Sequence, residues 1–154
     1  MPPRPSEALA RLGLTLPPPP RPVGSYAPVV VDGDRAWVSG QIVVRDGAAV
    51  PAGPVGDAVD VPTAQAAART ACLQALSLLA AALGDLDRIR RPIRLAAYVA
   101  CAPGFARTHE VANGATDLLV ALFGDEARPA RVTIGVAALP LNASVEIELT
   151  VATG

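Results

Sequence analysis

The segment at residues 63–83 limits the fold of this 154-residue chain more than any other stretch. It is mostly alanine and leucine, and Thr70, Gln74 and Ser77 recur three or four residues apart, which gives a helix one narrow polar stripe. The rest of such a helix must be buried. Its polar residues also interrupt the ~20 consecutive apolar residues that a membrane span needs. The segment therefore predicts a core helix that ends at Gly84, and no membrane span.

Short apolar runs separated by turn residues predict strands on both sides of this helix. Val29–Val31 and Ala36–Val38 flank Asp32-Gly33-Asp34 and predict a hairpin, whose second strand continues to a turn at Asp46-Gly47. Residues 48–60 are rich in Gly and Pro and predict a loop with short extended pieces. After the core helix we expect a strand, a helix and two further strands, at residues 93–101, 105–123, 132–137 and 144–151.

This order of elements predicts an α+β fold, in which a mixed β-sheet carries two helices on one face. Each strand–helix–strand unit favours parallel pairing through a right-handed crossover, and the hairpin adds antiparallel strands. The second face has no helix left to cover it, although hydrophobic residues make up 51% of the chain and the mean hydropathy is +0.38. We therefore expect that face to pack against the sheets of identical subunits.

Residues 1–22 differ from the rest of the chain, and we expect them to form an arm on a single domain at residues 23–154. Ser6 is predicted to cap a short helix that runs to Leu12. Pro17–Pro20 favour an extended polyproline II spacer, which we expect on the surface or against a neighbouring subunit. The beginning of the chain is unlike a signal peptide, so the expected location is the cytoplasm.

The composition argues against several kinds of chemistry. All thirteen basic residues are Arg, so no lysine amine can form a Schiff base or bind a phosphate. The net charge of −1 offers no basic surface for nucleic acid. A single His argues against a His-rich metal site. Cys72 and Cys101 lack the spacing of metal ligands, and we interpret them as reduced core thiols.

Arg131 and Glu146 are the first candidates for a site, each on one of the last two predicted strands. If these strands pair or neighbour each other, the two side chains can approach. A guanidinium binds a planar carboxylate through two parallel hydrogen bonds, and a carboxylate can position or deprotonate water. The alternative is an ion pair that stabilises the edge of the sheet.

Three further positions could serve a site or could be structural. Ser39-Gly40 would bring backbone close to a ligand, or would form a β-bulge without one. Tyr26 would line a pocket, or would be half-buried packing. Asn113-Gly114 is unusual inside a helix, and either function or close packing could explain it.

Five motifs, in this order, resemble those of the Rid/YjgF (reactive intermediate deaminase) family over about residues 22–152. They are Gly24-Ser25-Tyr26, Val38–Gln41, Pro129–Arg131, Leu139-Pro140 and Val145–Glu148. The resemblance implies a chorismate-mutase-like fold in a homotrimer, where three sheets form a central barrel and three clefts lie between subunits. Deaminases of this family hydrolyse reactive enamines and imines such as 2-aminoacrylate to a 2-keto acid and ammonia, with no metal or organic cofactor.

The resemblance also implies roles for the candidate residues. Arg131 would hold the carboxylate of a small-molecule substrate, and Glu146 would position the attacking water. The backbone at Ser39-Gly40 would meet the substrate nitrogen or the water, Tyr26 would line the cleft, and Asn113 would form a polar wall.

Two features depart from the pattern of the family, Thr133 and the segment between Phe105 and Asn113, which is longer than we expect for its deaminases. Thr133, expected in the same pocket, stands where many family deaminases have a Cys. The N-terminal helix and proline arm indicate an elaborated subgroup.

Four functions follow from this reading. The first is an imine or enamine deaminase. The second is a non-catalytic protein that binds a small carboxylate in the same cleft, but binding alone would not need Glu146. The third is a pathway-specific hydrolase with a larger substrate, which a more open or more apolar cleft would support. The fourth is the ribonuclease activity of some relatives, against which the acidic charge balance and the absence of Lys argue.

Overall fold

The computed structural model describes residues 4–154 and contains three α-helices and seven strands. The helices are α1 (Pro5–Arg11), α2 (Val61–Leu83) and α3 (Thr108–Phe123). The strands are β1 (Val29–Asp32), β2 (Arg35–Gln41), β3 (Val44–Arg45), β4 (Ala48–Ala49), β5 (Ile89–Ala100), β6 (Ala130–Val136) and β7 (Val145–Thr153). Short 3-10 turns are η1 (Leu86–Arg88), η2 (Asp125–Ala127) and η3 (Pro140–Asn142).

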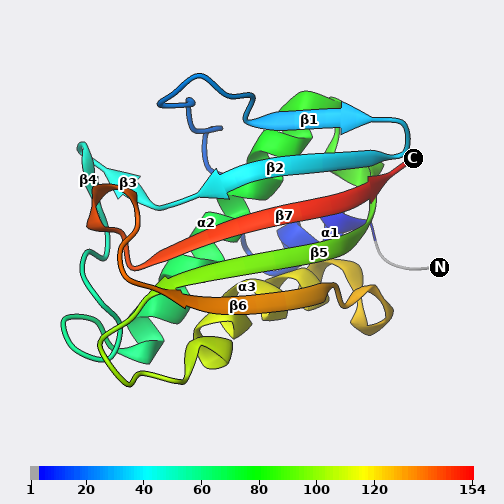
Figure 1. The fold of residues 1–154 in the computed structure, drawn as a ribbon. Helices are drawn as coiled ribbons and strands as arrows, with labels where there is room; N and C mark the ends of the chain where they lie inside the picture. The colour runs from blue at the N-terminus through cyan, green and yellow to red at the C-terminus, as the bar shows by residue number, and fades with distance from the viewer. Residues whose placement is uncertain (1–3) are drawn as a thin grey trace.

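The main sheet has the strand order β1-β2-β7-β5-β6 (Figure 1). Only β5 and β6 pair in parallel, and the other neighbours are antiparallel. The prediction of a mixed α+β sheet is therefore confirmed. The prediction of parallel pairing holds for β5–α3–β6 but is wrong for β2–α2–β5. There the last strand, β7, lies between the two strands that α2 connects.

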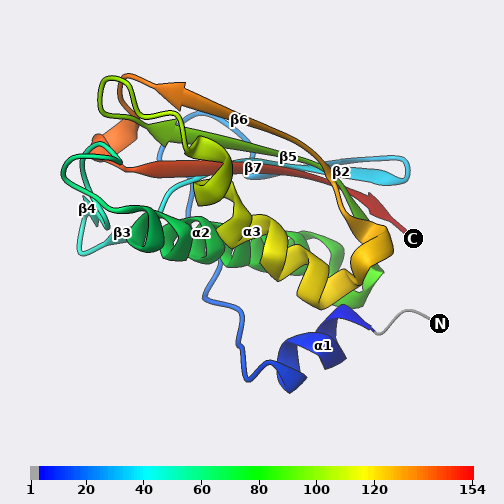
Figure 2. The same cartoon turned by 90° about the horizontal axis from the view of Figure 1, so that it is seen from below.

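The helices α2 and α3 cover one face of the sheet, and α1 lies on the far side of these helices (Figure 2). By length and composition alone α2 could cross a membrane. Here it is the core helix, with Ala68, Ala71 and Ala75 fully buried among the sheet and α3. Asp60 caps its start by accepting a hydrogen bond from the Thr63 amide. The prediction of a buried helix is confirmed.

The short N-terminal helix α1 forms, but Ser6 does not cap it. Ser6 lies within the helix, because Pro5 occupies its first position and Arg4 precedes it. The amide and hydroxyl of Ser6 instead donate to the Asp87 carboxylate at 2.9 and 2.7 Å. Farther along the arm, the carbonyl oxygen of Pro17 accepts a hydrogen bond from Ser77 on α2. The arm therefore packs against its own chain.

Two other element boundaries differ from expectation. The second hairpin strand does not run on to the turn at Asp46-Gly47, because β2 ends at Gln41 and β3 and β4 form a separate two-stranded sheet around that turn. The helix expected from residue 105 begins at Thr108.

The second face of the sheet is not covered by any helix of the described residues (Figures 1 and 2). Trp37 and Val30 pair there, and Ile134 joins them from β6; these side chains are 40%, 50% and 46% exposed. An open apolar face is what the element order predicts. Its packing against identical subunits stays a prediction.

Candidate active site

Glu146 on β7 lies against Gly40 on β2. The pairing of these strands shifts register between Val38 and Gln41, so the expected β-bulge is present. A Cβ atom at Gly40 would overlap the Glu146 carboxylate, so a larger residue there would displace this carboxylate from its present position. The same bulge directs the Ser39 hydroxyl to the carbonyl oxygen of Ala27, to which it donates at 2.7 Å. The Ser39-Gly40 pair thus forms both a bulge and the floor beneath a carboxylate.

Glu146 lines a pocket of about 300 Å³. The other walls are Val23, Tyr26, Ser39, Gly40, Ile42 and Pro140. The hydroxyl of Tyr26 accepts a hydrogen bond from the Val23 amide at 3.4 Å. The structure therefore brings four of the predicted site residues together at one end of the sheet: Tyr26, Ser39, Gly40 and Glu146.

The environment of Glu146 favours its protonated form. Burial raises the pKa of the carboxyl above its usual range, and the nearby negative charge of Glu148 raises it further. Within residues 4–154, no group donates a hydrogen bond to its oxygens. A carboxylate with a raised pKa and no internal partner is a stronger base than a free one and can bond to water.

Arg131 forms a second cluster with α3. Its Nη1 donates to Oδ1 of Asn113 at 2.7 Å and to Oγ1 of Thr116 at 3.0 Å, and its Nη2 donates to the carbonyl oxygen of His109 at 3.3 Å. Three of the five guanidinium N–H donors are thus occupied. The two that remain, on Nε and Nη2, are sufficient for a bidentate carboxylate contact.

A polar pocket of about 350 Å³ adjoins this guanidinium. Its lining residues are Asn113, Thr116, Asp117, Val120, Arg128, Pro129 and Arg131. It shares none of its lining with the pocket of Glu146.

Arg131 and Glu146 do not meet within one chain, because their strands neither pair nor neighbour each other. The strand β5 lies between β6 and β7. Arg131 pairs with Leu95 and Glu146 pairs with Tyr98. Paired residues share a face, and residues three apart on one strand lie on opposite faces. Arg131 therefore points to the helices and Glu146 to the open face, which also excludes an ion pair between them in the described chain.

A comparison with known proteins agrees with this fold. The family model described as "YjgF/chorismate_mutase-like, putative endoribonuclease" matches residues 6–152. The chain belongs to this YjgF family.

Individual members of similar sequence or structure extend the match over nearly the whole chain. Protein TCP17 of Trypanosoma cruzi is 42% identical over 144 residues, which are 93% of this chain and 90% of TCP17. The crystal structure of Atu1372 from Agrobacterium tumefaciens, of unknown function, is 40% identical with a TM-score of 0.85, covering 97% of this chain and 92% of that one. A "putative endoribonuclease" from Shewanella oneidensis is 29% identical with a TM-score of 0.90, covering 97% and 99%.

The remaining candidates suggested by the YjgF motifs lie near Arg131. Thr133 follows it by two residues on β6, so the two share a face, but Thr133 lines neither of the two pockets described above. Asn113 bonds Arg131, whereas Gly114 allows α3 to approach α2 so closely that a Cβ there would overlap the carbonyl oxygen of Gln65. Close packing accounts for Gly114, and Asn113 contacts the candidate residue Arg131.

Thr116 contacts Arg131 and was not among the sequence candidates. His109, Asn113 and Thr116 stand at i, i+4 and i+7 on α3, so they share one helix face. That spacing is a signal that could have identified Thr116 in this YjgF-family chain.

Neither cysteine has the properties of a nucleophile. Complete burial raises the pKa of the Cys72 thiol to about 12, and burial also raises that of Cys101. Within residues 4–154, no three His, Cys, Asp or Glu side chains are grouped so as to hold a metal ion.

Proposed function

We propose that this chain is an enamine/imine deaminase that converts 2-imino acids of the 2-aminoacrylate type to 2-keto acids and ammonia. The observation that carries the proposal is the hydrogen bonding of the Arg131 guanidinium. Its guanidinium is fixed by α3 and keeps two N–H donors for a carboxylate. The family membership and the YjgF motifs around Arg131 and Glu146 support it.

In this proposal Arg131 binds the substrate carboxylate before reaction. Its hydrogen bonds to Asn113, Thr116 and His109 restrict the guanidinium plane. A planar cation held in advance orients a planar carboxylate through two bonds and lowers the entropy that orientation would otherwise cost.

Glu146 acts on the water. The enamine first tautomerises to the imine, and water then adds to the C=N carbon while the carboxylate accepts a proton from it. The carboxyl group returns this proton to the nitrogen, which gives the carbinolamine. It then accepts the proton of the carbinolamine hydroxyl and passes it to the nitrogen as the C–N bond breaks, so that the carbonyl and ammonia form. A base with a raised pKa suits both proton transfers. A protein that only binds a carboxylate would have no use for such a group.

The two clusters require more than one subunit. Because Arg131 and Glu146 lie on opposite faces with β5 between their strands, one chain cannot direct both at a small substrate. We propose a homotrimer in which the open faces of three sheets form a central barrel and each cleft combines Arg131 of one subunit with Glu146 of the next. The exposed apolar side chains of Val30, Trp37 and Ile134 support such packing. A monomer in light scattering would contradict it.

The endoribonuclease activity in the family description finds less support in this chain. Its net charge is −1, and every basic residue is an Arg balanced by a similar number of acidic residues. Counterion release from a phosphate backbone needs a basic surface. Location in the cytoplasm and a separate arm at residues 1–22 stay predictions.

The test is a coupled assay in which a dehydratase generates 2-aminoacrylate and its disappearance is followed. We expect the wild type to accelerate hydrolysis and Arg131→Ala to lower kcat/KM at least about a hundredfold, because two charge-assisted hydrogen bonds are lost. Arg107→Ala is the matched control, since Arg107 is an exposed cation directly before α3 that pairs with Glu110 and lines neither pocket.

Each outcome has one meaning. No acceleration by the wild type would contradict the deaminase. Full activity of Arg131→Ala would contradict its role with the carboxylate, and an equal loss in Arg107→Ala would show that the assay reports general damage to α3.

A further inference from the structure

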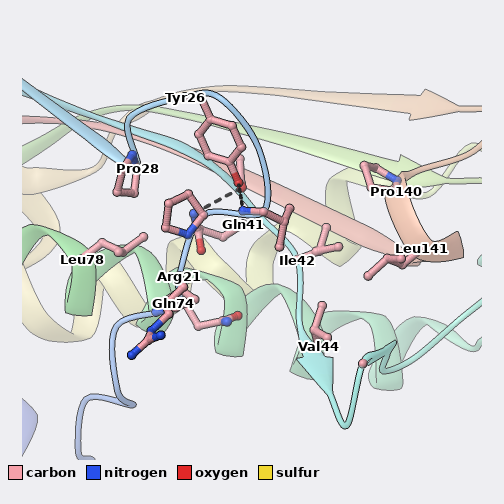
Figure 3. Close-up of a pocket in the computed structure, with 15 residues that line it drawn as sticks. Arg21, Tyr26, Pro28, Gln41, Ile42, Val44, Gln74, Leu78, Pro140 and Leu141 are labelled. Carbon is pink, nitrogen blue, oxygen red and sulfur yellow. Dashed lines mark hydrogen bonds between the residues drawn. The ribbon is translucent and has the colours of Figure 1, made fainter.

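A third pocket, of about 560 Å³, adjoins the pocket of Glu146 (Figure 3). The two share five lining residues, which are Val23, Tyr26, Gly40, Ile42 and Pro140. A ligand group near Glu146 can therefore continue into the larger space without leaving the protein surface. Cavities of this size fall within the range that holds small-molecule ligands.

The walls of this larger pocket are mostly apolar. They include Pro20, Pro22, Pro28, Val44, Leu78 and Leu141. Figure 3 shows Val44 on β3, Leu78 on α2 and Leu141 on η3 around this space. Pro20 and Pro22 belong to the arm, and Pro28 directly precedes β1. The arm is fixed beside α2 by the hydrogen bond between Ser77 and the carbonyl oxygen of Pro17. The proline arm thus forms one side of the pocket.

One polar group on the α2 wall has no partner. Oε1 of Gln74 is buried and accepts no hydrogen bond from the described residues. Gln74 lines the pocket, and in Figure 3 its amide extends from α2 towards the space below Ile42. A buried amide oxygen without a donor is unfavourable, and a rotation of the Gln74 side chain, which lines the pocket, would bring this oxygen to a ligand that carries an O–H or N–H group.

We propose that the pocket beneath the proline arm binds the side chain of the substrate. The substrate class is then 2-imino acids with an extended apolar side chain, and those with a terminal hydrogen-bond donor reach Gln74. A compound as small as 2-aminoacrylate would occupy only the Glu146 end. This inference rests on the proposed function for the position of the reacting carbon, and on the continuity of the two pockets for the rest.

Another occupant would be a side chain of a second subunit. A substrate side chain is favoured because the pocket opens directly into the space of Glu146. The experiment below separates these occupants.

Binding of the 2-keto acid products tests the pocket without turnover. Dissociation constants are measured by calorimetry for pyruvate, 2-oxobutanoate, 2-oxohexanoate and 2-oxooctanoate. We expect the affinity to rise about fourfold for each added methylene, as apolar burial predicts. Val44→Trp should abolish this gain by filling the pocket, and Arg45→Trp should keep it, because Arg45 is the next residue on β3 and points to the other side.

The contribution of Gln74 is tested with keto acids that end in a hydroxyl or in a methyl group. The wild type should prefer the hydroxyl compound, and Gln74→Leu should reverse this preference. The same preference in both proteins would overturn the assignment of Gln74.

Turnover separates this inference from the proposed function. If no imine is hydrolysed but the gain per methylene is present and lost only in Val44→Trp, the pocket stands and the deaminase does not. If 2-aminoacrylate is hydrolysed but affinity is independent of chain length, the inference is overturned and the deaminase stands. If a side chain of a neighbouring subunit fills the pocket, the affinity for the keto acids should likewise be independent of chain length, and the inference is overturned.

Discussion

Gly40 and Gly114 occupy two parts of the molecule and face the same steric problem. At each position a Cβ atom would overlap a neighbouring oxygen. At Gly40 the oxygen belongs to the flexible end of the Glu146 side chain, on the open face of the sheet. At Gly114 it is the backbone carbonyl oxygen of Gln65, where α3 crosses α2 in the core.

The difference shows how one residue type can serve function in one region and stability in another. The Glu146 carboxylate can rotate away from a methyl group added at Gly40. Gly40 therefore matters more for the position of this carboxylate than for the stability of the fold. A backbone carbonyl in a buried helix cannot rotate away without moving the helix. The comparison predicts that substitution by alanine lowers mainly the activity at Gly40 and mainly the stability at Gly114.

The largest expected effect is that of Gly114→Ala. The added methyl forces α3 away from α2 in a close-packed core, and such overpacking is expected to destabilise the fold by about 3 kcal/mol. For a chain of this size we expect a fall in Tm of about 6–12 °C by calorimetry. An unchanged Tm would show that α3 can move away from α2 without loss of stability, and would contradict this prediction.

Gly40→Ala should instead leave Tm almost unchanged and lower kcat for 2-aminoacrylate at least about tenfold, because the Glu146 carboxylate is displaced. Glu146→Gln is the matched variant and should show a loss in kcat at least as large, with little change in KM. If Gly40→Ala lowered Tm as much as Gly114→Ala, the contrast between the two glycines would be wrong.

Local patterns were enough to predict most elements. The narrow polar stripe predicted α2, and the alternation of Val145–Val151 predicted β7. They did not predict the strand order, because no local pattern records that β5 lies between β6 and β7. For that reason the sequence left open whether Arg131 and Glu146 could approach within one chain.

The candidate site shows the same limit. Gly40 and Gly114 were both singled out from the sequence, but whether each glycine serves a ligand or packing depends on which atom faces it. Ser6 was expected to cap α1 because serine commonly does so, but the proline before it occupies the first helical position. The pocket beneath the arm depends on Pro20 lying close to Leu78 and Leu141, which are distant in sequence.

A smaller effect is expected for Asn113→Ala, which tests the rigidity of the Arg131 cluster. Asn113 is a positioning residue, since it acts by holding the guanidinium. Loss of one hydrogen bond at an exposed position should raise KM about threefold to tenfold and change kcat little. Thr70→Ala is the control, because Thr70 bonds only the carbonyl oxygen of Ala66 on its own helix. A fall in kcat at constant KM would contradict positioning.

The smallest effect concerns the pH dependence of the Glu146 cluster. Burial and the charge of Glu148 raise the pKa of Glu146, and a base is active only above its pKa. The rate should therefore be lost as pH falls through this raised value. Glu148→Gln removes the second cause, so the acidic limb of the kcat profile should move to lower pH, while Glu126→Gln on η2 should not move it. Since burial is the larger cause, the limb should remain above that of a free glutamate. A limb that Glu148→Gln leaves in place would mean that a different group carries the proton.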